Sequence, residues 1–107
     1  MNMRKALVKI HGEQAGVLTE TEQRQYIFQY ETEYTGPPVS LAMPLRKEAY
    51  LFESFPPYFD GVLPEGVQLE GLLKRYKLDS EDYFAQLCLT GSDLVGAVVV
   101  EEMNSLA

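Results

Sequence analysis

The stretch Tyr58-Phe59-Asp60-Gly61-Val62-Leu63-Pro64-Glu65-Gly66 divides the chain into two halves of different character. Before it, apolar residues recur at every second position, which is the period of a β-strand. After it, they recur at every third or fourth position, which is the period of a helix. The stretch itself begins with aromatic residues and ends with a turn sequence. We interpret it as the junction of a small α+β domain and as a candidate contact surface.

The half before this junction is predicted to form an antiparallel meander of three strands. Residues 4–11 alternate in polarity, a glycine-containing turn follows over 11–14, and a second strand is expected over 16–19. The third strand is expected over 25–31, where aromatic residues at alternate positions suit a half-buried sheet. The faces that we expect to be buried carry Ala6, Val8 and Ile10 in the first strand, and Tyr26, Phe28 and Tyr30 in the third.

Prolines then interrupt the sheet, because proline lacks the N–H group that a strand ladder needs. Residues 39–44 are predicted to add a short edge strand that ends at Pro44, and residues 49–52 one more short strand. Pro56 and Pro57 break the chain again immediately before the junction.

Two helices are predicted after the junction. The first follows from apolar residues at i, i+3, i+4 and i+7, which share one helix face: Leu69, Leu72, Leu73 and Tyr76. Asp79 or Ser80 is expected to cap the N-terminus of the second helix. Gly91 is expected just beyond its C-terminus, where a left-handed backbone is common. The apolar side of the second helix is expected to consist of Tyr83, Phe84, Leu87 and Cys88.

The chain ends in a β-branched, almost wholly apolar segment over residues 94–100, which predicts a buried strand that returns to the N-terminal sheet. Residues 101–107 are predicted to fray. The predicted fold is a single α+β domain over residues 1–107. It combines a small antiparallel sheet, made of the meander and the C-terminal strand, with two to three short helices packed beside it.

The composition limits the classes of function. With 9 Lys and Arg against 16 Asp and Glu, the net charge of −7 argues against direct binding of nucleic acid, which needs a concentrated basic surface. The N-terminus lacks the apolar run of a signal peptide, and no apolar stretch approaches the about 20 residues that cross a bilayer. We therefore expect a cytoplasmic protein without membrane contact.

No catalytic, cofactor-binding or metal-binding constellation is found. His11 and Cys88 are the only residues of their types, so neither has the partners of a metal site or an activated nucleophile, and no internal disulfide can form. Residues 91–96 contain glycines but lack the lysine and spacing of a phosphate-binding loop. A small hydrolase stays open as a minor alternative, because carboxylates occur in pairs: Asp60 with Glu65, and Glu81 with Asp82. The main expectation is a chain that is not an enzyme and binds no cofactor.

Motifs spread over nearly the whole chain resemble the N-terminal subdomain of the HipA family of toxin kinases. Residues 59–66 resemble the family's F-x-x-LLPEG signature. The other matching residues are 7–16, Phe28 and Tyr30, Ser40, Leu41, Met43 and Pro44, Leu72 and Leu73, and finally Asp82, Phe84, Leu87, Gly91, Asp93, Gly96 and Ala97. The family's kinase body, with its catalytic Asp, metal-binding Asp and ATP-binding loop, lies C-terminal to this subdomain, and no part of this sequence corresponds to it.

As a free-standing copy of the subdomain, the chain is similar to the HipS-like antitoxins of bacterial three-gene HipBST toxin–antitoxin systems. That resemblance implies a protein that binds and inhibits a HipT-like serine/threonine kinase toxin. It also implies a ternary complex with a HipB-like helix-turn-helix protein, which binds the DNA. The alternative is a regulatory subdomain excised from a full-length HipA-type kinase, which would make intramolecular or HipB contacts.

The same resemblance points to the junction as the partner-binding surface. A rigid turn over residues 64–66 would present its neighbours to a cleft in the kinase, and aromatic residues are typical of interface hot spots. The expected contact residues are Tyr58, Phe59, Asp60, Leu63, Pro64, Glu65, Gly66, Val67 and Gln68. The alternative, in which the aromatic residues only cover a corner of the core, stays open.

Overall fold

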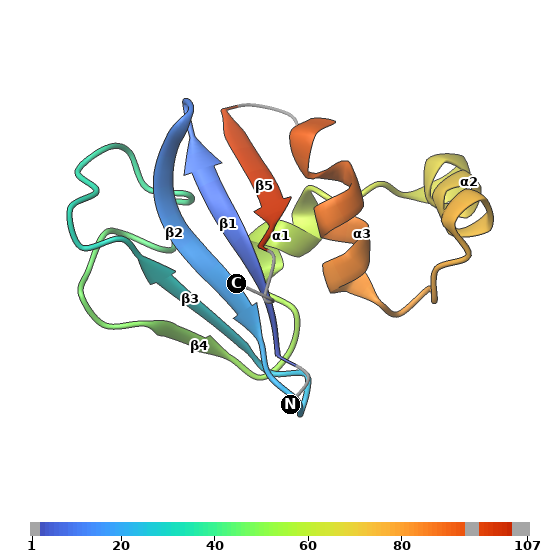
Figure 1. The fold of residues 1–107 in the computed structure, drawn as a ribbon, viewed down its shortest axis with the longest axis horizontal. Coiled ribbons are helices and arrows are strands. Elements are labelled where there is room, and N and C mark those ends of the chain that lie inside the picture. Colours follow the sequence, from blue (N-terminus) through green and yellow to red (C-terminus); the bar gives the residue numbers. More distant parts are fainter. Residues whose placement is uncertain (1–2, 94–96, 104–107) are drawn as a thin grey trace.

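A computed structural model describes residues 3–93 and 97–103 of the chain. In this part of the chain an antiparallel five-stranded sheet has the order β4-β3-β2-β1-β5 (Figure 1). The strands are β1 (Arg4–Ile10), β2 (Glu13–Glu20), β3 (Tyr26–Tyr30), β4 (Tyr50–Phe52) and β5 (Val98–Glu102). The helices are α1 (Pro57–Gly61), α2 (Gly66–Tyr76) and α3 (Tyr83–Thr90), followed by the 3₁₀ turn η1 (Gly91–Asp93). The predicted α+β class and the meander are confirmed.

The hairpin between β1 and β2 is tighter than predicted. Only His11 and Gly12 lie between the two strands, and both have a positive φ, 52° and 81°. Two such residues form the two-residue turn whose twist matches that of the flanking strands. The expected turn over 11–14 and strand over 16–19 were therefore wrong in their bounds, because β2 already begins at Glu13.

One face of the sheet carries the core. The alternation in β1 and β3 predicted this face correctly, since the six residues expected to be buried are at most 6% exposed. Helices α1 and α3 lie beside the sheet, whereas α2 lies beyond α3 (Figure 1). The helices add to the core cluster Phe59 from α1, and Phe84 and Leu87 from α3.

The segment between β3 and β4 is held by a tyrosine hydroxyl instead of a strand ladder. The predicted edge strand over 39–44 is wrong, because only one isolated bridge forms, between Ser40 and Met43. The hydroxyl of Tyr30 donates a hydrogen bond to the Met43 carbonyl oxygen and accepts one from the Val39 amide at 2.9 Å. Prolines flank this segment on both sides, and they leave too few N–H groups for regular pairing.

The C-terminal strand returns to the N-terminal sheet as predicted, since β5 pairs with β1. Its bounds differ from the prediction. Glu101 and Glu102, which were expected to fray, belong to β5, because Leu7 and Ala6 of β1 pair with them. Of the predicted strand, residues 94–96 lie outside the described part of the chain, as do residues 104–107 of the predicted frayed end.

Helix α3 begins and ends differently from the prediction. Its N-cap is Asp82, whose carboxylate accepts a hydrogen bond from the Ala85 amide, and not Asp79 or Ser80 as predicted. The Asp79 carboxylate instead accepts a hydrogen bond from the Glu81 amide in the preceding turn. At the other end Gly91 is right-handed, with φ −60°, because the chain continues into η1. Position 91 requires glycine for another reason, since a Cβ atom there would lie 1.8 Å from the Val100 carbonyl oxygen of β5.

An ionic cluster joins α3 to the first two strands. The Arg4 guanidinium donates two hydrogen bonds to the Asp82 carboxylate, at 2.8 and 3.2 Å, and one to Glu20 at 2.7 Å. The Tyr26 hydroxyl donates to the second oxygen of Glu20 at 2.8 Å. Burial on its own would raise the pKa of Asp82, but the bonds from Arg4 and the Ala85 amide outweigh burial and hold that pKa below its ordinary value.

This cluster predicts a stability that depends on pH. An aspartate whose pKa is lowered by folding stabilises the protein above about pH 4, and this stabilisation is lost as the pH falls further. Asp82→Asn, which keeps a capping side chain, is expected to lower the free energy of unfolding by about 1–3 kcal/mol near neutral pH. Urea unfolding at about pH 7 and about pH 3 checks this prediction. The difference in free energy of unfolding between Asp82→Asn and the wild type should be smaller at the acidic pH. An equal difference in free energy of unfolding at both pH values would contradict a stabilising role for the negative charge of Asp82.

No helix in residues 3–93 or 97–103 is both long enough and apolar enough to cross a bilayer.

Candidate functional site

The junction begins with a short helix that was not predicted from the sequence. Helix α1 spans Pro57–Gly61, with Pro57 in its first turn and the extended Pro56 as its N-cap. Proline suits the first helical position, because its φ is already fixed and its missing N–H has no partner there. The Asp60 amide donates to the Pro56 carbonyl oxygen at 3.0 Å. The two prolines therefore start a helix, where we had predicted only a break.

Part of the predicted contact surface lies in the core. Phe59 is 0% exposed, and its ring centroid is 6.0 Å from that of Phe28 in β3. Leu63 is also buried. The Tyr58 ring packs edge-on against Phe59 at 5.1 Å, and burial raises the pKa of its hydroxyl. These three side chains anchor the junction to the sheet, so we expect direct contact with a partner to fall to the other predicted residues.

The remaining predicted residues lie at the surface. Pro64 is half-buried, while Asp60, Glu65, Gly66, Val67 and Gln68 are exposed. Val67 is 83% exposed, although valine is among the residue types most often buried. Gly66 has φ 60°, a left-handed conformation that glycine adopts without strain. The turn thus depends on its glycine to direct the chain into α2, and it leaves Val67 pointing away from the core.

Helix α2 follows the junction and buries none of its 11 residues. Its apolar face was predicted correctly as helical, but the face does not enter the core. Leu69, Leu72 and Leu73 are half-buried and Tyr76 is 47% exposed. Figure 1 shows why, since α2 lies at the far side of α3 from the sheet. Within residues 3–93 and 97–103, α2 therefore keeps part of its apolar face exposed, although a helix of this length is marginal in water without tertiary packing.

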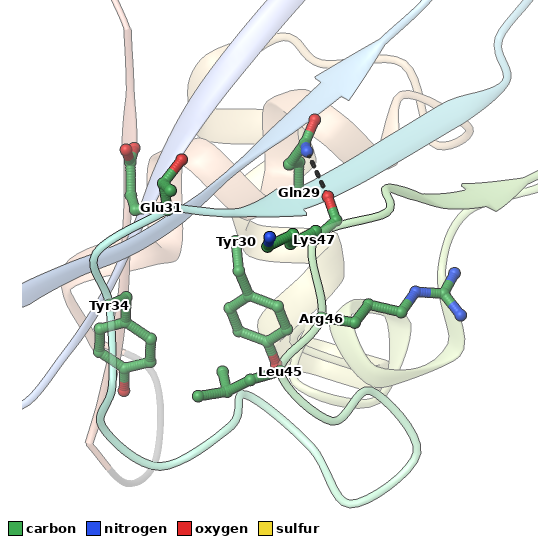
Figure 2. Close-up of a pocket in the computed structure, with 8 residues that line it drawn as sticks. Gln29, Tyr30, Glu31, Tyr34, Leu45, Arg46 and Lys47 are labelled. Carbon is green, nitrogen blue, oxygen red and sulfur yellow. Dashed lines mark hydrogen bonds between the residues drawn. The ribbon is translucent and has the colours of Figure 1, made fainter.

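A separate hollow of about 460 Å³ lies between the end of β3 and residues 45–47 (Figure 2). The side chains of Tyr30 and Tyr34 line it, but both hydroxyls already donate to backbone carbonyl oxygens. Arg46 points away from the hollow and stacks on Tyr50, with 3.6 Å between the guanidinium carbon and the ring centroid. Ligand sites need polar groups that converge and are free to bond, so the two tyrosine hydroxyls, which are already bonded, do not mark this hollow as such a site.

The candidate chemical groups lie in different parts of the fold. Burial raises the pKa of the Cys88 thiol to about 12, so the thiol stays protonated and unreactive. His11 is exposed in the β1–β2 turn. Asp82, from one of the carboxylate pairs, is bound to Arg4 and caps α3. Among the residues that the structure describes, no three His, Cys, Asp or Glu side chains are grouped so that they could hold a metal ion.

Three kinds of comparison with known proteins agree with one another. The model of the HipA N-terminal domain family matches residues 6–101. An uncharacterised protein of Haemophilus influenzae (strain ATCC 51907 / DSM 11121 / KW20 / Rd) is 31% identical over 100 residues, which cover 94% of this chain and 93% of that protein. A solved structure of the N-terminal domain of HipA toxin superimposes with a TM-score of 0.74 at 30% identity, covering 95% of this chain and 94% of that one.

Proposed function

We propose that this chain, which belongs to the HipA N-terminal domain family, is a non-catalytic antitoxin subunit that binds and inhibits a HipT-type serine/threonine kinase. The matched family is the HipA N-terminal domain, and the resemblance to HipA-type toxins implies that their kinase body would lie outside it. The chain would supply to the kinase, as a separate protein, the domain that full-length relatives carry on the same polypeptide. We expect the complex to include a HipB-like DNA-binding protein, since a net charge of −7 disfavours DNA contact by this chain alone.

The uncovered apolar surface at the junction carries this proposal. Val67 is 83% exposed next to a turn that Phe59, fully buried, anchors to the sheet. The half-buried leucines of α2, Leu69, Leu72 and Leu73, add apolar surface on another side of the helix. Surface of this kind beside a fixed turn is typical of a protein interface. Because the turn is already ordered, little conformational entropy is lost when the partner binds, which favours affinity.

Val67→Asp tests the surface. We expect the variant to bind the cognate HipT-type kinase at least about tenfold more weakly than the wild type, as isothermal titration would show; a short HipA-like kinase gene is to be sought in the neighbouring reading frame. Val67 contributes little to the core, so the free energy of unfolding should change by no more than about 0.5 kcal/mol.

Leu51→Asp is the matched control, because Leu51 is 76% exposed on β4, at the edge of the sheet. This variant should bind the kinase as tightly as the wild type. If Val67→Asp bound the kinase with the same affinity as the wild type, the junction would not be the surface that contacts the kinase. A wild-type chain that does not bind the kinase at all would overturn the antitoxin function itself.

A further inference from the structure

The segment between β3 and β4 presents an uncharged, apolar surface. Residues 34–45 contain no charged side chain, although charged residues make up 23% of the chain. Its exposed apolar residues are Pro37, Leu41, Ala42, Pro44 and Leu45. Leu41 is 96% exposed, more than any other large apolar residue that the structure describes. The centre of a protein interface has this composition, because charged residues are depleted there.

Tyrosine hydroxyls hold this segment in place. The Tyr30 hydroxyl bonds to the backbone on both sides of Leu41, where it accepts from an amide and donates to a carbonyl oxygen. The hydroxyls of Tyr34 and Tyr50 donate to the carbonyl oxygens of two prolines in the segment. A backbone hydrogen bond of 2.9 Å closes the turn over residues 40–43. Because the turn is already ordered, Leu41 can be bound with little loss of conformational entropy.

The hollow of about 460 Å³ lies next to this turn. Tyr30 belongs to both, since its ring lines the hollow and its hydroxyl holds the turn. Figure 2 shows Tyr30, Tyr34 and Leu45 around the hollow, where they form uncharged walls. The tyrosine hydroxyls are already bonded, so these walls suit an apolar side chain better than a polar ligand. An exposed leucine and an open apolar hollow therefore lie side by side.

Charges of opposite sign lie on the rim of the hollow. Glu31 comes before the uncharged segment and Lys47 after it, and both line the hollow (Figure 2). Both are exposed, and neither forms an ion pair with another residue of the described chain. In a pair of chains related by a two-fold axis the same surface meets itself, so Glu31 of one copy can face Lys47 of the other. This complementarity favours a second copy of the chain as the occupant.

We infer that two copies of this chain form a dimer in which Leu41 of each copy occupies the hollow of the other and Glu31 pairs with Lys47 across the interface. The contact closes after two copies, because each hollow is then filled. Two chains of net charge −7 repel each other, so the apolar contacts and the ion pairs must outweigh that repulsion. This association is independent of the proposed kinase binding. The segment between β3 and β4 lies at the opposite end of the molecule from α2, so a dimer leaves Val67 free (Figure 1).

Leu41→Asp tests the dimer. We expect the wild type to sediment as a dimer at about 100 µM, and Leu41→Asp to raise the dissociation constant of the dimer at least about tenfold. The unfolding midpoint should stay unchanged, because Leu41 is exposed and adds nothing to the core. A wild type that sediments as a monomer at about 1 mM, or a Leu41→Asp variant that dimerises as tightly as the wild type, would overturn the inference.

Reversal of the two charges tests how the copies are oriented. Glu31→Lys and Lys47→Glu each place like charges opposite one another, so each alone should weaken the dimer at least about threefold at low salt. The double variant restores opposite charges and should dimerise like the wild type. A double variant that dimerises no better than the single variants would overturn this arrangement of the two copies.

Leu51→Asp is the matched control, because Leu51 is also an exposed leucine, at 76%, but does not line the hollow. This variant and Val67→Asp should dimerise like the wild type, and Leu41→Asp should bind the kinase like the wild type. A monomeric wild type whose kinase binding is lost in Leu41→Asp would overturn the inference in favour of the kinase at this surface. A wild type that dimerises but does not bind the kinase would support the dimer and overturn only the proposed function.

Discussion

The Phe59→Ala variant is expected to lose about 3–5 kcal/mol of the free energy of unfolding, as measured by urea denaturation. Phe59 is 0% exposed and lies between the rings of Phe28 and Tyr58, so alanine would leave a cavity where α1 meets the sheet. Domains of this size are stable by about 5–15 kcal/mol in total, so the loss is a large fraction of the whole.

Val67→Ala is the control for this prediction. Val67 belongs to the same junction but is exposed, and its truncation should change the free energy of unfolding by no more than about 0.5 kcal/mol. Similar stability of Phe59→Ala and wild type would contradict the anchoring role of Phe59. Weak kinase binding by Phe59→Ala would follow from unfolding of the domain. The kinase-binding surface is therefore tested by substitutions at Val67 and not at Phe59.

Gly91→Ala is expected to lower the free energy of unfolding by about 3 kcal/mol or more, because the new methyl group would overlap a backbone atom of β5. The Cβ atom would lie 1.8 Å from the Val100 carbonyl oxygen and 2.7 Å from its carbonyl carbon. Neither atom can move unless β5 or η1 shifts. Thermal unfolding checks the loss, and faster amide hydrogen exchange in β5 than in β3 would show where the strain acts.

Gly61→Ala is the control for this substitution, because a Cβ atom at Gly61 would meet nothing within 4 Å and its φ is not positive. Alanine is the better helix former, so this variant should be as stable as the wild type or slightly more stable. Equal stability of Gly61→Ala and Gly91→Ala would show that the close approach to β5 does not determine the glycine at position 91.

The strands were predictable where one face is buried and the other meets water. This holds for β1 and β3, whose alternation identified Ala6, Val8, Tyr26 and Phe28 as core residues. The bounds of β2 were not predictable in the same way, because the turn at His11 depends on two positive φ angles and only one of the two residues is a glycine. Helix α1 was missed because its prolines were interpreted as a break, although proline in the first turn of a helix is a recognised start signal.

The site was predictable as a segment but not as a surface. The junction and the period of α2 are visible in the sequence, yet periodicity identifies an apolar face without saying what covers it. Phe59 and Val67 lie eight positions apart in the same predicted surface, and only the packing of α1 shows that one is buried and the other exposed. The ion pair of Arg4 with Asp82 joins residues 78 positions apart, and a local sequence pattern cannot predict such a contact.

Inhibition of the kinase is tested most directly by the rate at which the kinase transfers phosphate from labelled ATP while this chain is titrated into the reaction. We expect the rate to fall as the chain binds, Leu51→Asp to inhibit like the wild type, and Val67→Asp to inhibit only at concentrations at least about tenfold higher. A kinase that keeps its full rate while saturated with the wild-type chain would show that this chain is not its inhibitor.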